Sequence, residues 1–262
     1  MKQTILSFLS PDHPWKDKLI WLDSTDSTSD QLRLLARKGA EHGTIVLSDH
    51  QTGGHGRRGR SFHSPAGSGV YMSVLLRPSC SATELMHLTC AAAVAMCDAV
   101  EKAAGFRPDI KWTNDLVSGK RKLGGILTEL GFSPKGNVDY AIIGVGINCS
   151  QCPEDFPGEI RDIAGSLAMI TGHAIDRFRV AAAMMDAFYT MDLSQKDQIL
   201  QRYRQNCITI GREICLLRSD TTRYGTALDV DSEGALIVRF SDGSTESVNS
   251  GEVSIRGMYG YV

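Results

Sequence analysis

The segment QTGGHGRRGRSFHSP, residues 51–65, carries four glycines and three arginines between two β-rich runs, TIVLSD at 44–49 and VYMSVLLR at 70–77. Glycines leave the backbone free to turn its N–H groups toward an anion, and Arg57, Arg58 and Arg60 add positive charge beside them. An isolated Gly/Arg tract is more often a solvated basic turn. Together with its flanking strands and the motifs below, this one predicts a long mobile loop that binds phosphate.

Helices and strands are predicted on both sides of this loop. Residues 27–38, STSDQLRLLARK, place apolar side chains at helical spacing behind a Ser/Thr start. Ser81 and Glu84 form a capping-box pattern ahead of an Ala-rich run, which predicts the longest helix over 82–104 with a stop at Gly105. Further strands are expected at 109–112, 123–130 and 138–147, and further helices at 177–191 and 195–205.

The character of the chain changes at residue 207, after which short β-type runs dominate. The turn signals DSEG at 231–234 and SDGS at 241–244 divide these runs, and this pattern is typical of a small barrel of tight hairpins. The expected fold class is therefore α+β, with a mixed, largely antiparallel sheet and helices. We expect two domains, residues 1–206 and residues 207–262.

Residues 111–130, KWTNDLVSGKRKLGGILTEL, bring Lys111, Asn114, Asp115 and Lys122 close together in sequence. Lys122 stands at the start of an apolar strand, where its ammonium group can point into a pocket. The glycines at 124–125 leave room for a flat ligand against the backbone. A hairpin with solvated lysines explains this motif equally well when the motif is taken alone.

A third motif, GVGIN at 144–148, ends an apolar strand. Its alternate glycines expose one face of the strand to a ligand, and Asn148 offers both a donor and an acceptor. Alone it is more often a packing detail. It is not the G-x-G-x-x-G dinucleotide fingerprint, because neither a third glycine nor a helix follows in the required place.

Composition excludes several classes of protein. The 262 residues include 42% hydrophobic residues and carry a net charge of −2, which gives no overall attraction to nucleic acid or to an anionic membrane. Residues 1–21 contain no apolar run of about 20 residues and no signal-peptide core, so we expect a cytoplasmic protein. Seven cysteines suit reduced thiols, and the Cys149/Cys152 pair lacks the second pair that a zinc site needs.

In their order and spacing the motifs resemble those of the biotin protein ligases, whose signatures are S-T-N, Q-x-x-G-R-G-R-x-G-R, K-W-P-N-D with a downstream K-x-x-G-I-L, and G-x-G-I-N. The resemblance covers nearly the whole chain. It implies a catalytic domain similar to class II aminoacyl-tRNA synthetases, followed by a small SH3-like barrel. It also implies an activity: biotin and ATP form biotinyl-5′-AMP with Mg²⁺, and biotin is then transferred to a lysine of a biotin carboxyl carrier protein domain.

The resemblance assigns roles residue by residue. Catalysis falls to Lys122, Arg57, Arg60 and Asp115. Biotin binding falls to Ser27, Thr28, Gln51, Gly54, His55, Lys122, Gly125, Gly144 and Gly146. ATP or adenylate binding falls to Arg57, Arg58, Arg60, Phe62, Lys111, Asn114 and Asn148. No residue is assigned as a metal ligand.

Four positions depart from the family pattern. Ser29 replaces the Asn of S-T-N, and DST at 23–25 is a second candidate for that motif, although its spacing to Gln51 is less favourable. His55 replaces the first loop arginine and removes a permanent charge. Thr113 replaces a proline, and Phe62 stands where tryptophan is common.

Three other functions compete with this interpretation. Lipoate ligases share the general fold but lack the GHGRRGR and KWTND arrangement. A DNA-binding repressor would need a helix-turn-helix module of about 60 residues, whereas only 26 residues precede Ser27, so we expect no DNA binding. Retention of Lys122 and the loop arginines argues against a non-catalytic adaptor. The sequence leaves open which carrier is modified and whether the chain forms a homodimer through its sheet.

Overall fold

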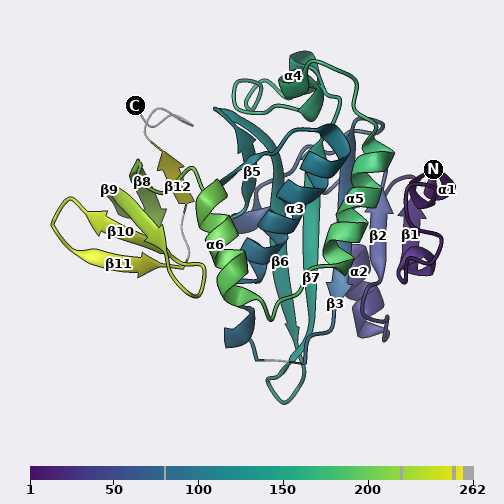
Figure 1. Cartoon of the computed structure of the whole chain (residues 1–262), viewed down its shortest axis with the longest axis horizontal. Coiled ribbons are helices and arrows are strands. Elements are labelled where there is room, and N and C mark those ends of the chain that lie inside the picture. The colour runs from purple at the N-terminus through teal and green to yellow at the C-terminus, as the bar shows by residue number, and fades with distance from the viewer. Residues whose placement is uncertain (80, 219–220, 250–251, 256–262) are drawn as a thin grey trace.

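The computed structural model describes residues 1–79, 81–218, 221–249 and 252–255. Within them the larger sheet has seven strands in the order β1-β2-β3-β7-β6-β5-β4 (Figure 1). Only the β1–β2 pairing is parallel among the described strands of this sheet, which confirms the expectation of a largely antiparallel sheet. Its strands are β1 (Leu19–Leu22), β2 (Ile45–Ser48), β3 (Gly69–Leu76), β4 (Asp109–Lys111), β5 (Asp115–Ser118), β6 (Arg121–Phe132) and β7 (Val138–Asn148).

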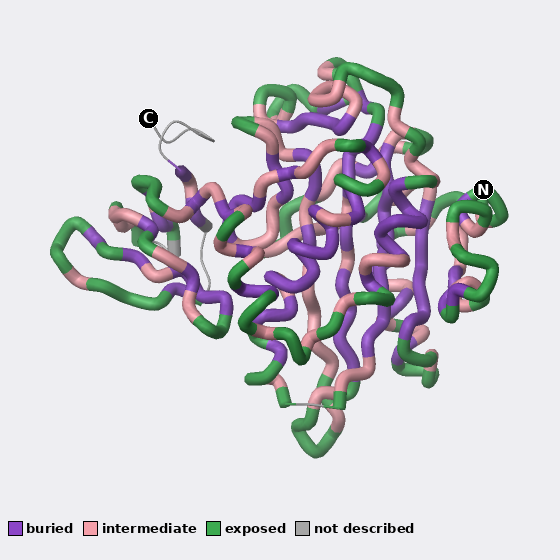
Figure 2. The backbone as a smooth tube through the Cα atoms, viewed as in Figure 1, coloured by how far each residue is buried: buried purple, intermediate pink, exposed green. Residues whose placement is uncertain are grey.

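Helices cover both faces of this sheet, in agreement with the continuous burial of its strands β2 and β3. On one face, Val46, Leu75 and Ile142 pack with α2 (Thr28–Arg37). The opposite face belongs to the main core, which includes α3 (Leu88–Ala104), α5 (Arg177–Tyr189) and α6 (Lys196–Asn206). Strands β2 and β3 are buried along their whole length as a result (Figure 2).

The Ala-rich helix begins later than the sequence predicts. Ser81 and Glu84 do make the reciprocal capping bonds, at 2.9 and 3.3 Å, but they head a short 3-10 turn at Thr83–Leu85. Helix α3 starts only after His87, whose ψ of 2° is not helical, and it ends as predicted at Gly105 in the left-handed conformation. Among the described residues, the stretch Thr83–Ala104 is long and apolar enough to span a membrane, but 72% of an 18-residue window within it is buried inside the protein, as in a core helix.

Several short elements give too little periodicity to be predicted. They are α1 (Lys2–Leu6), β1, β5, α4 (Leu167–Thr171) and the 3-10 turns η1 (Lys16–Lys18), η2 (Arg57–Gly59) and η4 (Pro153–Asp155). Each spans three to five residues, too few for a helical or alternating pattern to show. Strand β5 is the most important omission, because it turns the predicted 111–130 hairpin into three antiparallel strands, β4, β5 and β6.

A second sheet of five antiparallel strands occupies the C-terminal part of the described chain, in the order β11-β10-β9-β8-β12. The DSEG and SDGS segments form the predicted turns, with Gly234 and Gly243 both at φ +87°. The Trp112 indole N–H donates to the Gly234 carbonyl at 3.0 Å and so joins this sheet to the larger one. The strands are β8 (Glu213–Arg218), β9 (Thr221–Val230), β10 (Leu236–Phe240), β11 (Thr245–Val248) and β12 (Glu252–Ile255).

Candidate active site

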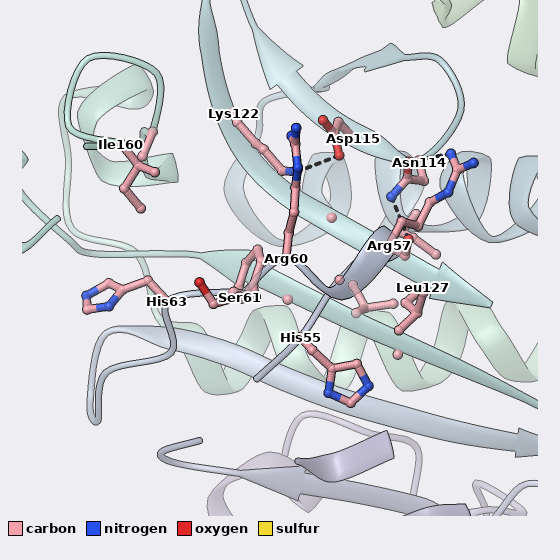
Figure 3. A pocket seen from close by; sticks show the side chains of 18 of the residues that line it. His55, Arg57, Arg60, Ser61, His63, Asn114, Asp115, Lys122, Leu127 and Ile160 are labelled. Carbon is pink, nitrogen blue, oxygen red and sulfur yellow. Dashed lines mark hydrogen bonds and ion pairs between the residues drawn. The ribbon is translucent and has the colours of Figure 1, made fainter. Parts of the chain in front are cut away.

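A cavity of about 530 Å³ lies on the α2 side of the larger sheet, where β6 and β7 meet the glycine-rich loop (Figure 3). Every residue assigned above to biotin, ATP or catalysis lines it except Gly54. The motif around Ser27 supplies Ser27, Thr28 and Ser29, whereas the competing residues 23–25 do not line the cavity. Segments far apart in sequence therefore meet at one cavity.

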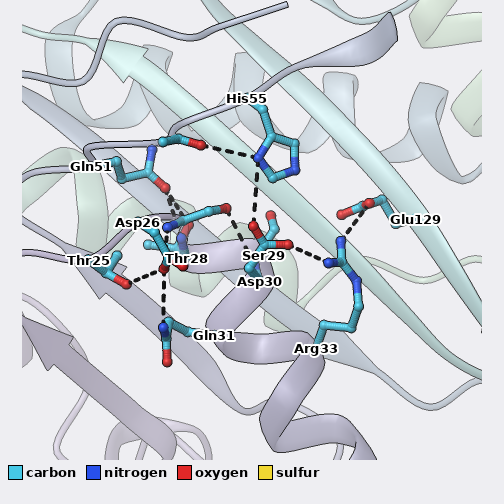
Figure 4. A network of polar contacts seen from close by, with 12 residues as sticks. Thr25, Asp26, Thr28, Ser29, Asp30, Gln31, Arg33, Gln51, His55 and Glu129 are labelled. Carbon is cyan, nitrogen blue, oxygen red and sulfur yellow. Dashed lines mark hydrogen bonds and ion pairs between the residues drawn. The ribbon is translucent and has the colours of Figure 1, made fainter. Parts of the chain in front are cut away.

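One end of the cavity is built from neutral hydrogen-bonding groups at the start of α2. Ser27 caps this helix by accepting the backbone N–H of Asp30. The backbone N–H and the hydroxyl of Thr28 both approach the side-chain carbonyl of Gln51, at 2.9 and 3.1 Å (Figure 4). We call this group, with Ser29 and Ser73, the hydroxyl end. Ser27, Thr28 and Ser29 are each less than 10% exposed.

The opposite end carries charge. The Lys122 ammonium lies 2.6 Å from a carboxylate oxygen of Asp115, with side-chain exposures of 34% and 17% (Figure 3). Arg57 reaches the side-chain oxygen of Asn114 at 3.3 Å, and the Asn114 amide donates to the Ile126 carbonyl at 2.8 Å. We call these four side chains, with Arg60, the charged end. Burial lowers the pKa of the Arg57 guanidinium, while the nearby Asp115 carboxylate raises it.

Backbone hydrogen bonds close the glycine-rich loop into a hairpin. The N–H of Gly56 donates to the Arg60 carbonyl at 2.7 Å, and that of Phe62 donates to the Gly54 carbonyl at 2.8 Å. At its tip Arg58 has φ +61° and Gly59 has φ +73°, a left-handed pair that the glycine makes easier to form. Arg58 also donates to the Leu217 carbonyl of β8, at 3.4 Å.

Two of the predicted nucleotide-binding residues also form hydrogen bonds with the protein itself. The buried Lys111 donates from Nζ to the Val253 carbonyl of β12 at 2.6 Å. Asn148 donates to the Gly165 carbonyl at 2.9 Å and accepts from Gln151 at 3.3 Å. Both line the cavity, so any effect they have on a nucleotide also passes through the segments that they hold.

The predicted glycines play different parts. At Gly54, a Cβ would stand 2.7 Å from Ser64 Oγ and 2.9 Å from Gln51 Nε2, so this glycine lets Gln51 pack and lies behind the cavity wall. At Gly146, a Cβ would stand 2.3 Å from the Phe62 ring, which therefore lies directly over that glycine. Gly54, to which the sequence assigned biotin binding, therefore does not line the cavity in this structure.

Several wall residues were not predicted, and they share an apolar character or a distant position in sequence. The 156–164 segment forms part of the cavity wall, and β12 brings the second sheet to the cavity. Neither carries a polar motif that could have identified it. The wall residues from these regions are Phe156, Glu159, Ile160, Ile163, Ala164, Val253 and Ser254, together with Trp112, Ile126, Leu127 and Val145 from the larger sheet.

The cysteines lie apart from this chemistry. Cys149 is buried, which raises the pKa of its thiol to about 12. Cys152 is exposed and its thiol lies 3.1 Å from the Asp155 carboxylate. In the described part of the chain, no group of three or more His, Cys, Asp or Glu side chains is arranged to hold a metal ion. Cys80 lies outside the described residues.

Comparisons with known proteins agree with this geometry. Residues 21–148 match the family model described as the biotin/lipoate A/B protein ligase family, and residues 209–256 match the biotin protein ligase C-terminal domain. A bifunctional ligase/repressor BirA of Bacillus subtilis is 38% identical over 86% of this chain and 70% of its own length. A biotin–[acetyl-CoA-carboxylase] ligase of Mycobacterium tuberculosis is 30% identical over 87% of this chain and 85% of its own.

A solved structure is similar over nearly its full length. The biotin protein ligase of Aquifex aeolicus, in complex with biotin and ATP, has a TM-score of 0.75 and 29% sequence identity. The match covers 91% of this chain and 98% of the other. The α+β fold and the small C-terminal β domain expected from the sequence are thereby confirmed.

Proposed function

We propose, because this chain belongs to the biotin/lipoate A/B protein ligase family, that its cavity joins biotin to ATP and then transfers biotin to a protein lysine. The chain is an ATP-dependent biotin protein ligase. The observation that carries the proposal is that Lys122, the loop arginines and the hydroxyl end all line one cavity. This supports the proposal that a cyclic urea binds at the hydroxyl end and an acyl phosphate at the charged end.

In the first step, a biotin carboxylate oxygen attacks the α-phosphorus of ATP. The bond between the α-phosphorus and the bridging oxygen breaks, and pyrophosphate leaves with that electron pair. Lys122, Arg57 and Arg60 line the same wall and meet the negative charge that grows on the phosphate oxygens. In a partly dry site one such donor contributes about 3 kcal/mol to lowering the barrier.

In the second step, the uncharged amine of a carrier lysine attacks the acyl carbon of biotinyl-5′-AMP. An amide bond forms, the bond from the acyl carbon to the phosphate oxygen breaks, and AMP leaves. Asp115 stands 2.6 Å from Lys122 and is only 17% exposed, so it can take the proton that the incoming amine loses or orient Lys122.

ATP enters as its Mg²⁺ complex in this proposal. Mg²⁺ is commonly held by substrate phosphates with one or two carboxylates rather than by an all-protein cage. The cavity fits this arrangement, because Asp115 and Glu159 line it while the described residues form no carboxylate cluster of their own.

The carrier in this proposal is the biotin carboxyl carrier domain of a biotin-dependent carboxylase. Two of the relatives are named biotin–[acetyl-CoA-carboxylase] ligases. We further propose that the chain acts in the cytoplasm without binding DNA, that residues 1–206 form the catalytic domain and residues 207–262 the barrel, and that pairing through the sheet is the route to any homodimer.

The test is to incubate the protein with biotin, Mg·ATP and a biotin carrier domain and to weigh the carrier by mass spectrometry. We expect the carrier to gain one biotinyl group only when all components are present. A carrier of unchanged mass would contradict the proposal.

Lipoate is the substrate to compare, since the matched family model includes lipoate ligases. A dithiolane ring makes no use of the buried hydroxyl and amide groups around Gln51, which would then lose their solvent partners without compensation. We expect biotin to support ATP/pyrophosphate exchange and lipoate to support little.

A further inference from the structure

The buried Ser73 belongs to no motif, yet it joins two residues of the cavity wall. It lies in β3 and is 0% exposed. Its hydroxyl oxygen stands 2.8 Å from the Thr28 hydroxyl and 2.9 Å from the Ser29 hydroxyl. In the sheet Ser73 pairs with Gly144, where a Cβ would stand 2.5 Å from Ser29 Oγ. The glycine therefore leaves space for this hydroxyl chain.

The direction of every proton in this chain follows from counting. Three contacts link Gln51 Oε1, Thr28, Ser73 and Ser29 in a row. The three hydroxyls supply three protons, and the amide oxygen supplies none. Each contact needs one proton, so Thr28 donates to Gln51, Ser73 donates to Thr28, and Ser29 donates to Ser73.

The far side of Gln51 fixes the same orientation independently. The backbone N–H of Thr28 donates to Oε1, which must therefore be the oxygen. The amide nitrogen Nε2 donates to Ser64 Oγ at 3.0 Å, and the Ser64 hydroxyl donates in turn to the Phe62 carbonyl at 2.9 Å. Because Ser64 has spent its proton on Phe62, it can only accept from Gln51, so the amide cannot be flipped.

We propose that Ser73 is a positioning residue: it accepts the Ser29 hydroxyl proton and donates its own to Thr28, whose proton goes to Gln51, so that neither the Thr28 nor the Ser29 proton points into the cavity. The two wall hydroxyls then present only lone pairs to a ligand. They accept N–H groups and repel ring oxygens, so this wall selects a ligand with hydrogen-bond donors at that position. The inference rests on the proposed function, in which the ureido ring of biotin supplies those N–H groups.

Substitution of Ser73 by alanine tests this arrangement. Without Ser73 the Ser29 hydroxyl can turn its proton into the cavity. We expect the KM for biotin in ATP/pyrophosphate exchange to rise about 10-fold with kcat within about twofold of wild type, as expected for one lost partner in a buried network. A kcat loss equal to the KM rise would contradict a positioning role.

Discrimination between ligands gives the sharper readout. The probe is the cyclic carbonate analogue of biotin, in which both ring N–H groups are replaced by oxygen, and it is measured by competition against biotin. Wild type should bind it at least about 100-fold more weakly than biotin, because lone pairs would face lone pairs. Ser73→Ala should reduce the preference for biotin over the carbonate analogue about 10-fold. Adding Ser29→Ala should abolish the improved binding of the carbonate, because the newly available proton belongs to Ser29.

Ser48→Ala is the matched control. Ser48 is also a fully buried serine of the same sheet, in β2, but its hydroxyl donates to the His50 carbonyl at 2.8 Å and takes no part in the chain. Ser48→Ala should leave unchanged both the KM for biotin and the preference for biotin over the carbonate analogue. Ser73→Cys fills the position with a thiol, a weak donor and a weak acceptor, and should act like Ser73→Ala if the alanine variant does not fold.

An unchanged ratio in folded Ser73→Ala or Ser73→Cys would overturn the inference, as would a wild-type protein that binds the carbonate as well as biotin. A wild type without any biotin-dependent exchange would instead overturn the proposed function itself.

Discussion

The two ends of the cavity recognise their ligands by different physics. The hydroxyl end consists of neutral groups whose hydrogen bonds are already ordered by the protein. Its residues Ser27, Thr28 and Ser29 are each less than 10% exposed. The charged end has Lys122 with 34% of its side chain exposed. A neutral network selects by geometry and donor direction, whereas exposed charges attract anions broadly and are screened by salt. The first end suits specificity and the second suits chemistry.

The difference also appears in how the two ends are assembled. The charged end comes largely from one contiguous segment, with Asn114, Asp115 and Lys122 on or beside β5 and β6. The hydroxyl end gathers its members from α2, β3 and the segment after β2. We therefore expect substitutions at the charged end to change rates, and substitutions at the hydroxyl end to change ligand preference.

The largest expected effect is that of Lys122→Ala. In the proposed function it removes an ammonium group from the place where the acyl phosphate forms, so biotin-dependent ATP/pyrophosphate exchange should fall by about 100- to 1,000-fold. The protein should stay folded by circular dichroism, because Lys122 is part-exposed. Lys120→Ala, in the exposed turn before it, is the matched control and should be nearly normal. Near-normal exchange by Lys122→Ala would refute the division between the two ends.

A smaller effect is expected from Arg60→Ala in the loop. This arginine lines the cavity, and in the proposed function its charge meets the phosphate. We expect the adenylate to dissociate about 10 to 100 times faster, as for the loss of one charge-assisted contact. Release of a fluorescent adenylate analogue in a stopped-flow instrument measures this rate. A rate equal to wild type would remove the loop from the charged end.

The strand pair beneath both ends can be disturbed by Gly124→Ala. A Cβ at this position would stand 2.5 Å from the Gly146 carbonyl oxygen, and the backbone of β7 cannot rotate away as a side chain can. We expect the free energy of unfolding to fall by about 1 to 3 kcal/mol. Urea denaturation measures the free energy of unfolding. Gly136→Ala is not a suitable control, because that glycine has φ +82° and an alanine there would be strained for a different reason. An unchanged free energy of unfolding would contradict the close approach of β6 and β7 at Gly124.

The smallest expected effect is the difference in how ionic strength changes ligand binding at the two ends of the cavity. Raising the ionic strength from about 0.05 to 0.5 M shortens the screening length severalfold. We expect the KM for ATP to rise a few-fold while the affinity for biotin alone changes less, measured by exchange kinetics and calorimetry respectively. An equal response of both ligands would mean that charge, and not neutral hydrogen bonding, dominates biotin binding.

Sequence reasoning predicted the polar residues that belong to the recognised motifs and missed the apolar wall and the polar residues outside those motifs, such as Glu159 and Ser254. Ser27 was recognisable because a serine ahead of a helical pattern is a cap, and the GHGRRGR segment because glycine and arginine together are rare in strands. Ser73 gave no signal, since one serine within VYMSVLLR looks like any small residue in an apolar strand. Its importance depends on pairing across β3 and β7 that no local pattern records.

Other differences have similar physical causes. The Ser81/Glu84 box was a sound local signal, but a box specifies only the first turn, and here that turn is a separate 3-10 segment. The contact of Lys111 with Val253 joins residues 142 positions apart, so its ammonium could not be assigned from sequence. Local chemistry was predictable where one segment supplies it and unpredictable where the fold brings segments together.

The most direct measurement is a crystal structure of this protein with a non-hydrolysable analogue of biotinyl-5′-AMP. The ring should lie against Thr28, Ser29 and Gln51 with its N–H groups directed at oxygen atoms, and the phosphate isostere should lie within about 3.2 Å of the Lys122 ammonium. A ligand bound in the opposite direction, or with its phosphate away from Lys122, would contradict the account.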